Sequence, residues 1–225
     1  QADVYAEVSP LVRSVVDGYP VCIFAYGQTG SGKTYTMEGP PGDRGVSYRA
    51  VEELFSMLGA GGLTTHEVRV SFMEIYQESI RDLLAPHPGS QCSSRLEVMT
   101  DGEGQTHIPG LTVRAVGSTE EVLRVLGEGN RVRAQAATNI NEHSSRSHAI
   151  FTVYTSVTDA ATGATAAGKL HLIDLAGSER VSKSGATGER MKEAQAINKS
   201  LSTLGDIIAA LQARATHVPY RNSKL

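Results

Sequence analysis

The sequence predicts an α/β fold in which a central, mostly parallel β-sheet carries helices on both faces. Strand-like and helix-like segments alternate along the chain, which is the pattern of crossover connections between parallel strands. The 225 residues are 40% hydrophobic, a share sufficient for a buried core. A glycine-rich segment also lies between an apolar, strand-like run and the start of a helix. A chain of this length fits one large domain, and no linker-like stretch divides it.

The N-terminal elements are expected to be a helix and a buried strand. Ser9 followed by Pro10 is typical of a helix N-cap with proline at the first helical position. We therefore expect a helix that begins at this pair and ends near residue 17. Residues 21–26 form a continuous apolar run, which predicts a strand buried on both faces.

Two helices and an alternating strand are expected next. A helical stretch begins at Lys33, and residues 48–58 place apolar side chains at helical spacing. Residues 67–76 alternate as a strand with one apolar face. That face consists of Val68, Val70 and Phe72.

The following segments alternate between short strands and a helix. Turn signals divide residues 96–116 into short strands. Residues 118–121 match a capping box, which predicts a helix from there to about Arg133. Two more strands are expected at 148–158 and 170–175.

The last expected helix, residues 190–213, has the clearest periodicity because its apolar residues recur at alternating spacings of three and four. This stripe consists of Ala194, Ile197, Leu201, Leu204, Ile208 and Leu211.

The charge of the chain is unevenly distributed. The formal net charge is −3, but residues 169–225 carry +4 and residues 1–168 carry −7. This distribution indicates a localised acidic partner rather than general nucleic-acid binding. Cys22 and Cys92 have no neighbours at metal-ligand spacing, and no apolar stretch reaches the length of a membrane span. We therefore expect an intracellular chain that makes no membrane contact.

The glycine-rich segment matches the phosphate-binding pattern G-x-x-x-x-G-K-[ST]. Its glycines allow consecutive backbone N–H groups to curve around phosphate oxygens. Lys33 would then reach the outer phosphates, and the Thr34 hydroxyl would ligate Mg²⁺. A glycine-rich surface turn is the alternative, but the position between a strand and a helix favours nucleotide binding. The residues of this loop are Gly27, Gln28, Thr29, Gly30, Ser31, Gly32, Lys33 and Thr34.

Two further polar segments accompany predicted strands. Residues 141–148 could bond phosphate, although such a segment alone is more often a solvated loop. Residues 172–180 are a strand that ends in D-x-x-G, with Asp174 expected on the Mg²⁺ side and the Gly177 N–H facing a γ-phosphate. D-x-x-G turns are common by themselves. The combination of all three motifs in this order, each beside a predicted strand, is uncommon.

These three segments, together with residues 217–225, resemble the kinesin motor domain over essentially the whole chain. Residues 107–112 and 181–213 are most similar to the C-terminal-motor, minus-end-directed branch. The resemblance implies the kinesin motor fold, hydrolysis of ATP with Mg²⁺, and binding to microtubules (tubulin). It also implies a cytoplasmic, cytoskeletal protein that dimerises through a coiled coil outside this chain. Against the family pattern, residues 1–225 are expected to be a motor domain without its first strand, C-terminal helices and neck.

The resemblance further implies a role for each matching residue. Lys33 and Mg²⁺ would neutralise charge on the γ-phosphate. Ser144 and Ser145 would close over this phosphate and orient the attacking water, while Glu179 would pair with Arg146 and receive a proton through water. The implied catalytic residues are Lys33, Ser144, Ser145, Arg146, Gly177 and Glu179. The implied metal-side residues are Thr34, Ser145 and Asp174.

The resemblance adds three smaller assignments. Tyr35 would pack against adenine, although a core aromatic is an equal reading of this residue from the sequence alone. Asn141 would help to order the loop that contains Ser144. The implied microtubule contacts lie on the basic segment and are Lys183, Arg190, Lys192, Lys199, Arg221 and Lys224.

Two other classes of protein share part of this pattern. A signalling-type GTPase would carry N-K-x-D, but the pair Asn198–Lys199 lies inside a predicted helix and has no following Asp. A nucleotide-binding, microtubule-binding module without productive motility is the second alternative, and the intact set of motif residues argues against it. If the family's neighbouring strands are absent, residues 21–26 would form an apolar edge strand that promotes aggregation.

Overall fold

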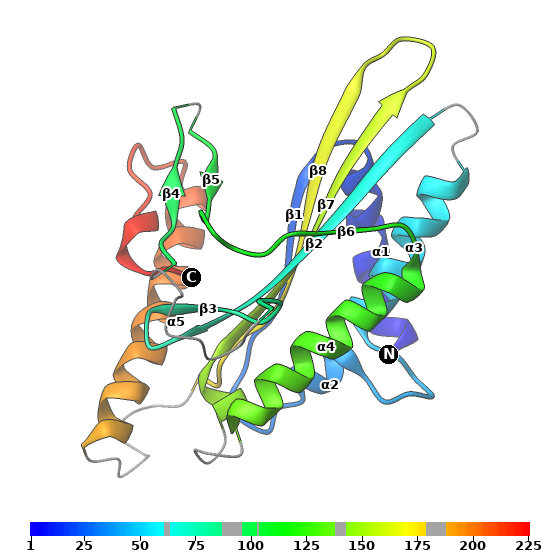
Figure 1. The fold of residues 1–225 in the computed structure, drawn as a ribbon. Coiled ribbons are helices and arrows are strands. Elements are labelled where there is room, and N and C mark those ends of the chain that lie inside the picture. Colours follow the sequence, from blue (N-terminus) through cyan, green and yellow to red (C-terminus); the bar gives the residue numbers. More distant parts are fainter. Residues whose placement is uncertain (61–63, 87–95, 103, 138–142, 179–187) are drawn as a thin grey trace.

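The computed structural model describes residues 1–60, 64–86, 96–102, 104–137, 143–178 and 188–225 (Figure 1). Within these residues a six-stranded sheet has the order β1-β8-β7-β2-β3, with β6 paired to β2, and β4 and β5 form a separate hairpin. The strands are β1 (Pro20–Ala25), β2 (Thr64–Tyr76), β3 (Ser79–Asp82), β4 (Met99–Thr100), β5 (Thr106–His107), β6 (Arg114–Val116), β7 (His148–Asp159) and β8 (Thr165–Asp174).

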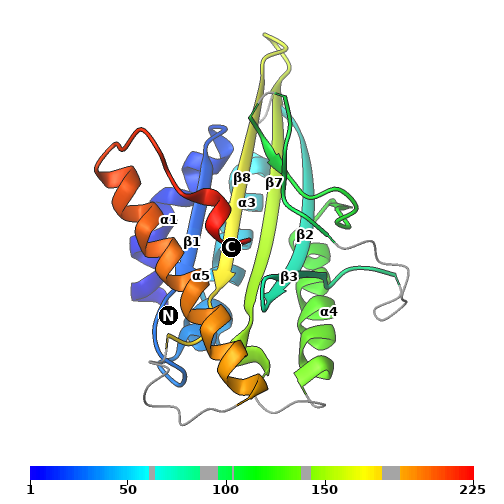
Figure 2. The ribbon, with the colours of Figure 1, turned by 90° about the vertical axis from the view of Figure 1, so that its left-hand side faces the viewer.

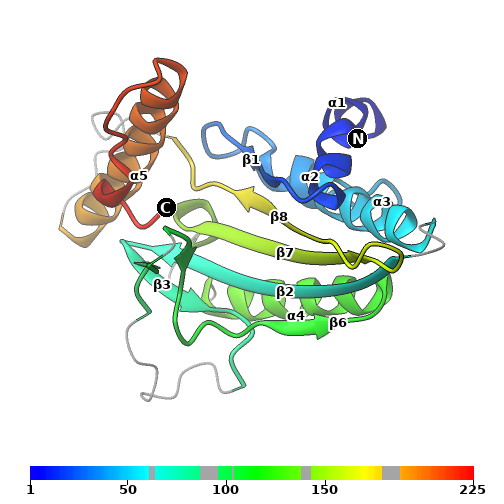
Figure 3. The ribbon, with the colours of Figure 1, turned by 90° about the horizontal axis from the view of Figure 1, so that it is seen from above.

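The helices lie on both faces of this sheet, as predicted. α1, α2, α3 and α4 cover one face, and α5 lies across the other, as Figures 2 and 3 show from two directions. The helices are α1 (Ala2–Val16), α2 (Lys33–Glu38), α3 (Val46–Ala60), α4 (Thr119–Ala137) and α5 (Glu189–Gln212), with short 3-10 helices η1 (His143–Arg146) and η3 (Tyr220–Asn222).

The prediction of a mostly parallel sheet is wrong for the described strands. Only β1 and β8 run parallel, and the other paired strands are antiparallel. For β7 and β8 the reason is their short connection, since a parallel pair needs a crossover of a dozen or more residues. The Asp159 carboxylate accepts the N–H groups of Ala161 (2.9 Å) and Thr162 (2.7 Å), and Gly163 takes a left-handed φ of +70°. These contacts close a tight hairpin.

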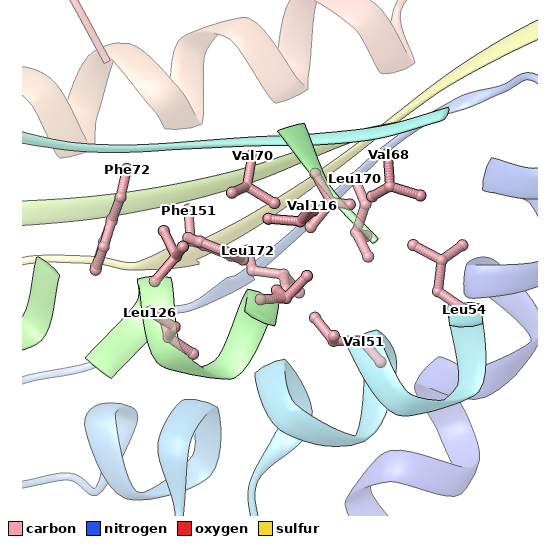
Figure 4. Packing of buried hydrophobic residues seen from close by; sticks show 14 of the residues in the cluster. Val51, Leu54, Val68, Val70, Phe72, Val116, Leu126, Phe151, Leu170 and Leu172 are labelled. Carbon is pink, nitrogen blue, oxygen red and sulfur yellow. The ribbon is translucent and has the colours of Figure 1, made fainter. Parts of the chain in front are cut away.

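Two apolar clusters lie on opposite faces of the sheet because strand residues alternate in direction. Val70 and Phe72 of β2 join the larger cluster beneath α3 and α4 (Figure 4), whereas Ile75 joins the cluster beneath α5. Phe72 meets Phe151 of β7 edge to face, with ring centroids 5.5 Å apart. The predicted apolar face of residues 67–76 is confirmed.

The first helix begins earlier than predicted. α1 starts at Ala2, and Pro10 lies in its interior, so Ser9 is not an N-cap. The Ser9 hydroxyl instead donates to the Glu53 carboxylate of α3 at 2.8 Å, and the Tyr5 hydroxyl donates to the same carboxylate. Packing of α1 against α3 therefore outweighs the local cost of a proline within the helix.

β1 is an edge strand, and the prediction that both of its faces are buried is wrong. Among the described strands β1 pairs with β8 alone. Its side chains alternate: Val21 and Ile23 pack against the larger cluster, while Cys22 is exposed and Phe24 is 36% exposed. The apolar edge expected for residues 21–26 is confirmed.

Two helix predictions needed smaller changes. α4 begins with the predicted capping residues, since the Ser118 hydroxyl accepts the Glu121 N–H at 3.3 Å, but it continues past Arg133 to Ala137. α5 matches its predicted range within one residue. The last two residues of its apolar stripe are not covered, because Ile208 and Leu211 are 45% and 51% exposed.

Candidate nucleotide site

The glycine-rich loop connects β1 to α2, as the motif requires. Gly30 and Gly32 have φ values of +79° and +90°, which favour glycine, and a Cβ at either position would meet nothing within 4 Å. The space over the loop is therefore open. The Lys33 ammonium donates to the Gln28 carbonyl at 3.0 Å and so lies folded over the loop. This arrangement can accept an anion in contact with both the backbone and the lysine.

The metal-side residues meet at the end of the parallel pair β1 and β8. Ala25 is in register with Asp174, and the Thr34 hydroxyl donates to Asp174 Oδ2 at 2.7 Å. Asp174 Oδ1 is buried, and among the described residues it has no hydrogen-bond partner. A buried carboxylate oxygen beside a hydroxyl is the type of oxygen donor set that Mg²⁺ takes. The residues present therefore fit a Mg²⁺ ion.

Sequence reasoning missed a buried ion network behind Asp174. Arg133 of α4 lies 3.4 Å from Asp174 Oδ2 and 3.5 Å from Glu74 Oε1 of β2. The Ser147 hydroxyl donates to the same Glu74 oxygen at 2.6 Å, and the Ser147 carbonyl accepts from Arg133 at 3.2 Å. Removing one partner would leave a buried charge without a counter-ion, which is strongly unfavourable. The network therefore holds the Asp174 side chain in place. The one available sequence signal was Glu74, the single charged residue in the run 72–76 of β2.

The two polar segments predicted to surround the γ-phosphate contact each other directly. The Gly177 N–H donates to the Ser145 carbonyl at 2.7 Å, and the Ser178 N–H donates to the Gly27 carbonyl at 3.1 Å. All three sequence motifs therefore meet at one place. For the Gly177 N–H to reach a phosphate, as expected, it must first leave Ser145.

Arg146 forms an ion pair with a residue that the sequence did not single out. Its guanidinium lies 2.6 Å from Glu193 Oε2 of α5, and the Tyr76 hydroxyl donates to the other oxygen of Glu193 at 2.9 Å. Partial burial and the bonded Glu193 carboxylate raise the pKa of Tyr76. Glu179, the expected partner of Arg146, lies outside the described residues. So do Asn141 and the Ser144 side chain.

Tyr35 lies where a base could reach it. Its ring is 58% exposed in the first turn of α2, directly after the phosphate-binding loop. This exposure excludes the alternative that Tyr35 is an aromatic residue of the hydrophobic core. An exposed ring at this place is available for stacking on adenine.

The basic residues near the C-terminus are not equally available. Arg190, Lys192, Lys199 and Arg221 are exposed, whereas Lys183 lies outside the described residues. The Lys224 side chain is only 17% exposed, and its ammonium lies 2.6 Å from the Glu97 carboxylate. Lys224 is therefore less exposed than the other four described basic residues, and its contact with microtubules stays a prediction. No helix in the described part of the chain has the length and apolar character of a membrane span.

The fold and the glycine-rich loop define a P-loop nucleotide-binding α/β domain. A family model described as the kinesin motor domain matches residues 1–225. The chain belongs to this family, and its fold class is the kinesin motor fold.

The relatives agree with this assignment. The chain is 52% identical over 226 residues to the rice protein "Kinesin-like protein KIN-14E", covering 100% of this chain and 21% of that protein. It matches the "Structure of a fast kinesin" with a TM-score of 0.88 and 44% identity, covering 100% of this chain and 64% of that one. It also matches the C-terminal motor of Kar3Vik1 with a TM-score of 0.86 and 44% identity, covering 99% and 57%.

These matches confirm the resemblance to the kinesin motor domain and to its C-terminal-motor branch. The chain spans about a fifth of the length of the curated relatives that it matches.

Proposed function

We propose that this chain hydrolyses ATP and couples the reaction to microtubule binding and movement. The observation that carries the proposal is the meeting of the three motifs: Thr34 contacts Asp174, and the Ser145 carbonyl accepts the Gly177 N–H. One loop can thus hold phosphates while two adjoining segments respond to the γ-phosphate.

The proposed reaction is in-line attack of water on the γ-phosphorus, with the β–γ bridging oxygen as leaving group. Bound Mg²⁺ supplies positive charge to the phosphate oxygens, and Thr34, Ser145 and Asp174 are the residues that would hold it, Asp174 through water. Lys33 stabilises the charge that develops on the phosphates. Ser144 and Ser145 orient the attacking water.

The attacking water loses its proton to Glu179 through a water chain, after Glu179 has paired with Arg146. In the described structure Arg146 is held by Glu193 of α5. Formation of the expected pair therefore requires Arg146 to leave α5. Loss of this contact would release one end of the helix at the moment when the site closes.

The exposed basic residues of α5 and η3 form the proposed contact with tubulin. Arg190, Lys192, Lys199 and Arg221 carry it, and the basic C-terminal quarter complements an acidic filament. Because the chain matches part of a C-terminal motor structure with 44% identity, covering 57% of that chain, we propose minus-end-directed movement, dimerisation through a coiled coil elsewhere in the protein, and a cytoplasmic, microtubule-bound location. The polarity of filament gliding tests the direction.

Steady-state ATP turnover of the intact protein, measured with and without microtubules, tests the proposal. Turnover that rises with microtubules supports a motor ATPase. Microtubule binding without turnover favours the non-motile binding module instead. Lys33→Ala should abolish nucleotide binding, and Glu179→Ala should retain binding but stall hydrolysis. Arg69→Ala, on an exposed strand position, is the control variant and should change neither.

A further inference from the structure

His148 has no role in the reaction proposed above, although it ends the segment that contains Ser145 and Arg146. It is the first residue of β7 and is 3% exposed. Its imidazole lies between the backbone of Ala176, two residues after the end of β8, and Ser200 of α5. These are the two parts of the chain that nucleotide-dependent movement has to connect.

Hydrogen bonds determine the tautomer of the ring. The Ala176 N–H donates to His148 Nδ1 at 3.1 Å, and a backbone N–H can only donate, so Nδ1 carries no proton. The neutral ring then carries its proton on Nε2, which lies 2.8 Å from Ser200 Oγ. Ser200 Oγ donates in turn to the Ile197 carbonyl at 2.8 Å. Every donor in this series therefore has an acceptor.

Burial keeps the ring in this neutral form. Desolvation is the main cause that lowers the pKa of His148 to about 4, with Arg133 acting in the same direction and Glu78 against it. A protonated ring would have no acceptor for the Ala176 N–H. The series of hydrogen bonds is thus intact throughout the physiological pH range.

The contacts of α5 next to Ser200 are apolar and do not fix a register by themselves, while the polar contacts of Glu193 with Arg146 and Tyr76 lie about two helical turns earlier. Ile197 and Leu201 of α5 pack against Leu175 and Ala176 in the smaller cluster. Such contacts are non-directional, so they hold α5 against the sheet but allow it to shift. The hydrogen bonds through His148 add direction. They also attach α5 to the residue that precedes Gly177, whose N–H is bonded to Ser145.

We propose that His148 is a positioning residue that transmits movement of the Ala176–Gly177 segment to α5 through Ser200. The inference rests on the proposed function, because a bound nucleotide must draw the Gly177 N–H away from Ser145. That displacement moves the adjoining Ala176 N–H, then the imidazole, and then Ser200. This route through side chains is separate from the covalent connection between β8 and α5.

Three variants break one link in this route. His148→Asn keeps an acceptor for the Ala176 N–H, but its side chain is too short to contact Ser200. Ser200→Ala removes the same link from the other side with a minimal change in a helix. Because both variants break one contact, the double variant should do no more than either single variant. Ser202→Ala is the matched control, since its exposed hydroxyl bonds only within α5.

Hydrogen exchange of the α5 amides is measured on the intact protein with MgADP and with Mg²⁺ and a non-hydrolysable ATP analogue. In the wild type and in Ser202→Ala, we expect the exchange rates in the two states to differ by about fivefold or more. In His148→Asn, Ser200→Ala and the double variant, the difference should fall below about twofold, while MgADP affinity stays within about threefold of wild type.

A merely structural role would give a different result. The variants would then raise the exchange rates of the α5 amides equally in both nucleotide states, and the ratio of the two rates would stay as in the wild type. This outcome overturns the inference. Equal exchange rates in the two nucleotide states of the wild type overturn it as well. The assay needs neither turnover nor microtubules. The two claims can therefore fail separately. If microtubules do not stimulate turnover but the nucleotide response of α5 depends on His148, the proposed function is overturned and this inference is supported. If microtubules stimulate turnover but the nucleotide response of α5 is unchanged in the His148 and Ser200 variants, the proposed function is supported and this inference is overturned.

Discussion

Gly129 of α4 faces the ring of Phe72, and this contact gives a sharp test of the described core. A Cβ built at Gly129 would lie 2.2 Å from Phe72 Cδ1, far inside van der Waals contact. Phe72 cannot easily move, because it is 2% exposed and packs against Phe151. Gly129→Ala should therefore destabilise the domain even though alanine is the better helix former.

The size of the effect follows from two opposing terms. Overpacking costs about 1–3 kcal/mol, and replacing glycine by alanine inside a helix returns up to about 1 kcal/mol. Because 2.2 Å is a severe overlap, the cost lies in the upper part of that range, and the expected net loss is about 1–2 kcal/mol. Gly127, two residues earlier in the same helix, has nothing within 4 Å of its built Cβ. Gly127→Ala should therefore stabilise the domain by about 0.5–1 kcal/mol.

Native-state hydrogen exchange of the β2 amides in the intact protein measures both variants. Since about 1.4 kcal/mol corresponds to a tenfold change, Gly129→Ala should accelerate exchange roughly five- to thirtyfold, and Gly127→Ala should slow it. Phe72→Leu should cost less in the Gly129→Ala background than in the wild type, because the two sites contact each other. Equal or slower exchange in Gly129→Ala would refute the packing described for α4 on β2.

Three further outcomes are expected. Phe72→Ala should lower the free energy of unfolding by about 3–5 kcal/mol, measured by denaturant titration, because it removes a buried ring; a loss below about 1 kcal/mol would contradict that burial. In the folded protein the pKa of His148 is about 4, below its ordinary value of 6.5. The unfolded state therefore binds a proton that the folded state does not bind in this pH range. The free energy of unfolding should fall by about 3 kcal/mol from pH 6.5 to pH 4. His148→Gln should lack this part of the pH slope, and an unchanged slope would show that the ring titrates normally when folded. Replacing Arg190, Lys192 and Lys199 together with alanine should weaken microtubule co-sedimentation and leave basal turnover unchanged; unaltered co-sedimentation would remove α5 from the binding surface.

The nucleotide loop was predictable because its chemistry is local. Glycines at fixed spacing, followed by Lys33 and Thr34, determine both the backbone path and the ligand groups within eight residues. The strand that ends at Asp174 was predictable for the same reason. That the two meet at 2.7 Å follows from the parallel pairing of β1 with β8, which the sequence did not specify.

The direction of the other strands was not predictable from that pattern. Small residues between positions 160 and 168 carry no strand signal, so the hairpin between β7 and β8 was hidden. The start of α1 was wrong for a related reason. Ser9 and Pro10 have strong local preferences, but the contact with Glu53, more than forty positions away, decides how they are used.

The contacts that connect the site to α5 were missed because their partners are distant in sequence. Arg146 and Glu193 are separated by 47 positions, and His148 and Ser200 by 52. Each has an ordinary reading when taken alone: a charged helix residue, a serine on a helix, a histidine at the start of a strand. Only the packing of α5 against the ends of β7 and β8 brings them together.

The affinity of the intact protein for microtubules, measured with a non-hydrolysable ATP analogue and again with ADP, tests the central claim most directly. A nucleotide site that acts on α5 must give two different dissociation constants, and by linkage microtubules must change nucleotide affinity by the same factor. We expect the two dissociation constants for microtubules to differ by about tenfold or more. Equal affinities in the two nucleotide states would show that the site and the basic face of α5 are not coupled.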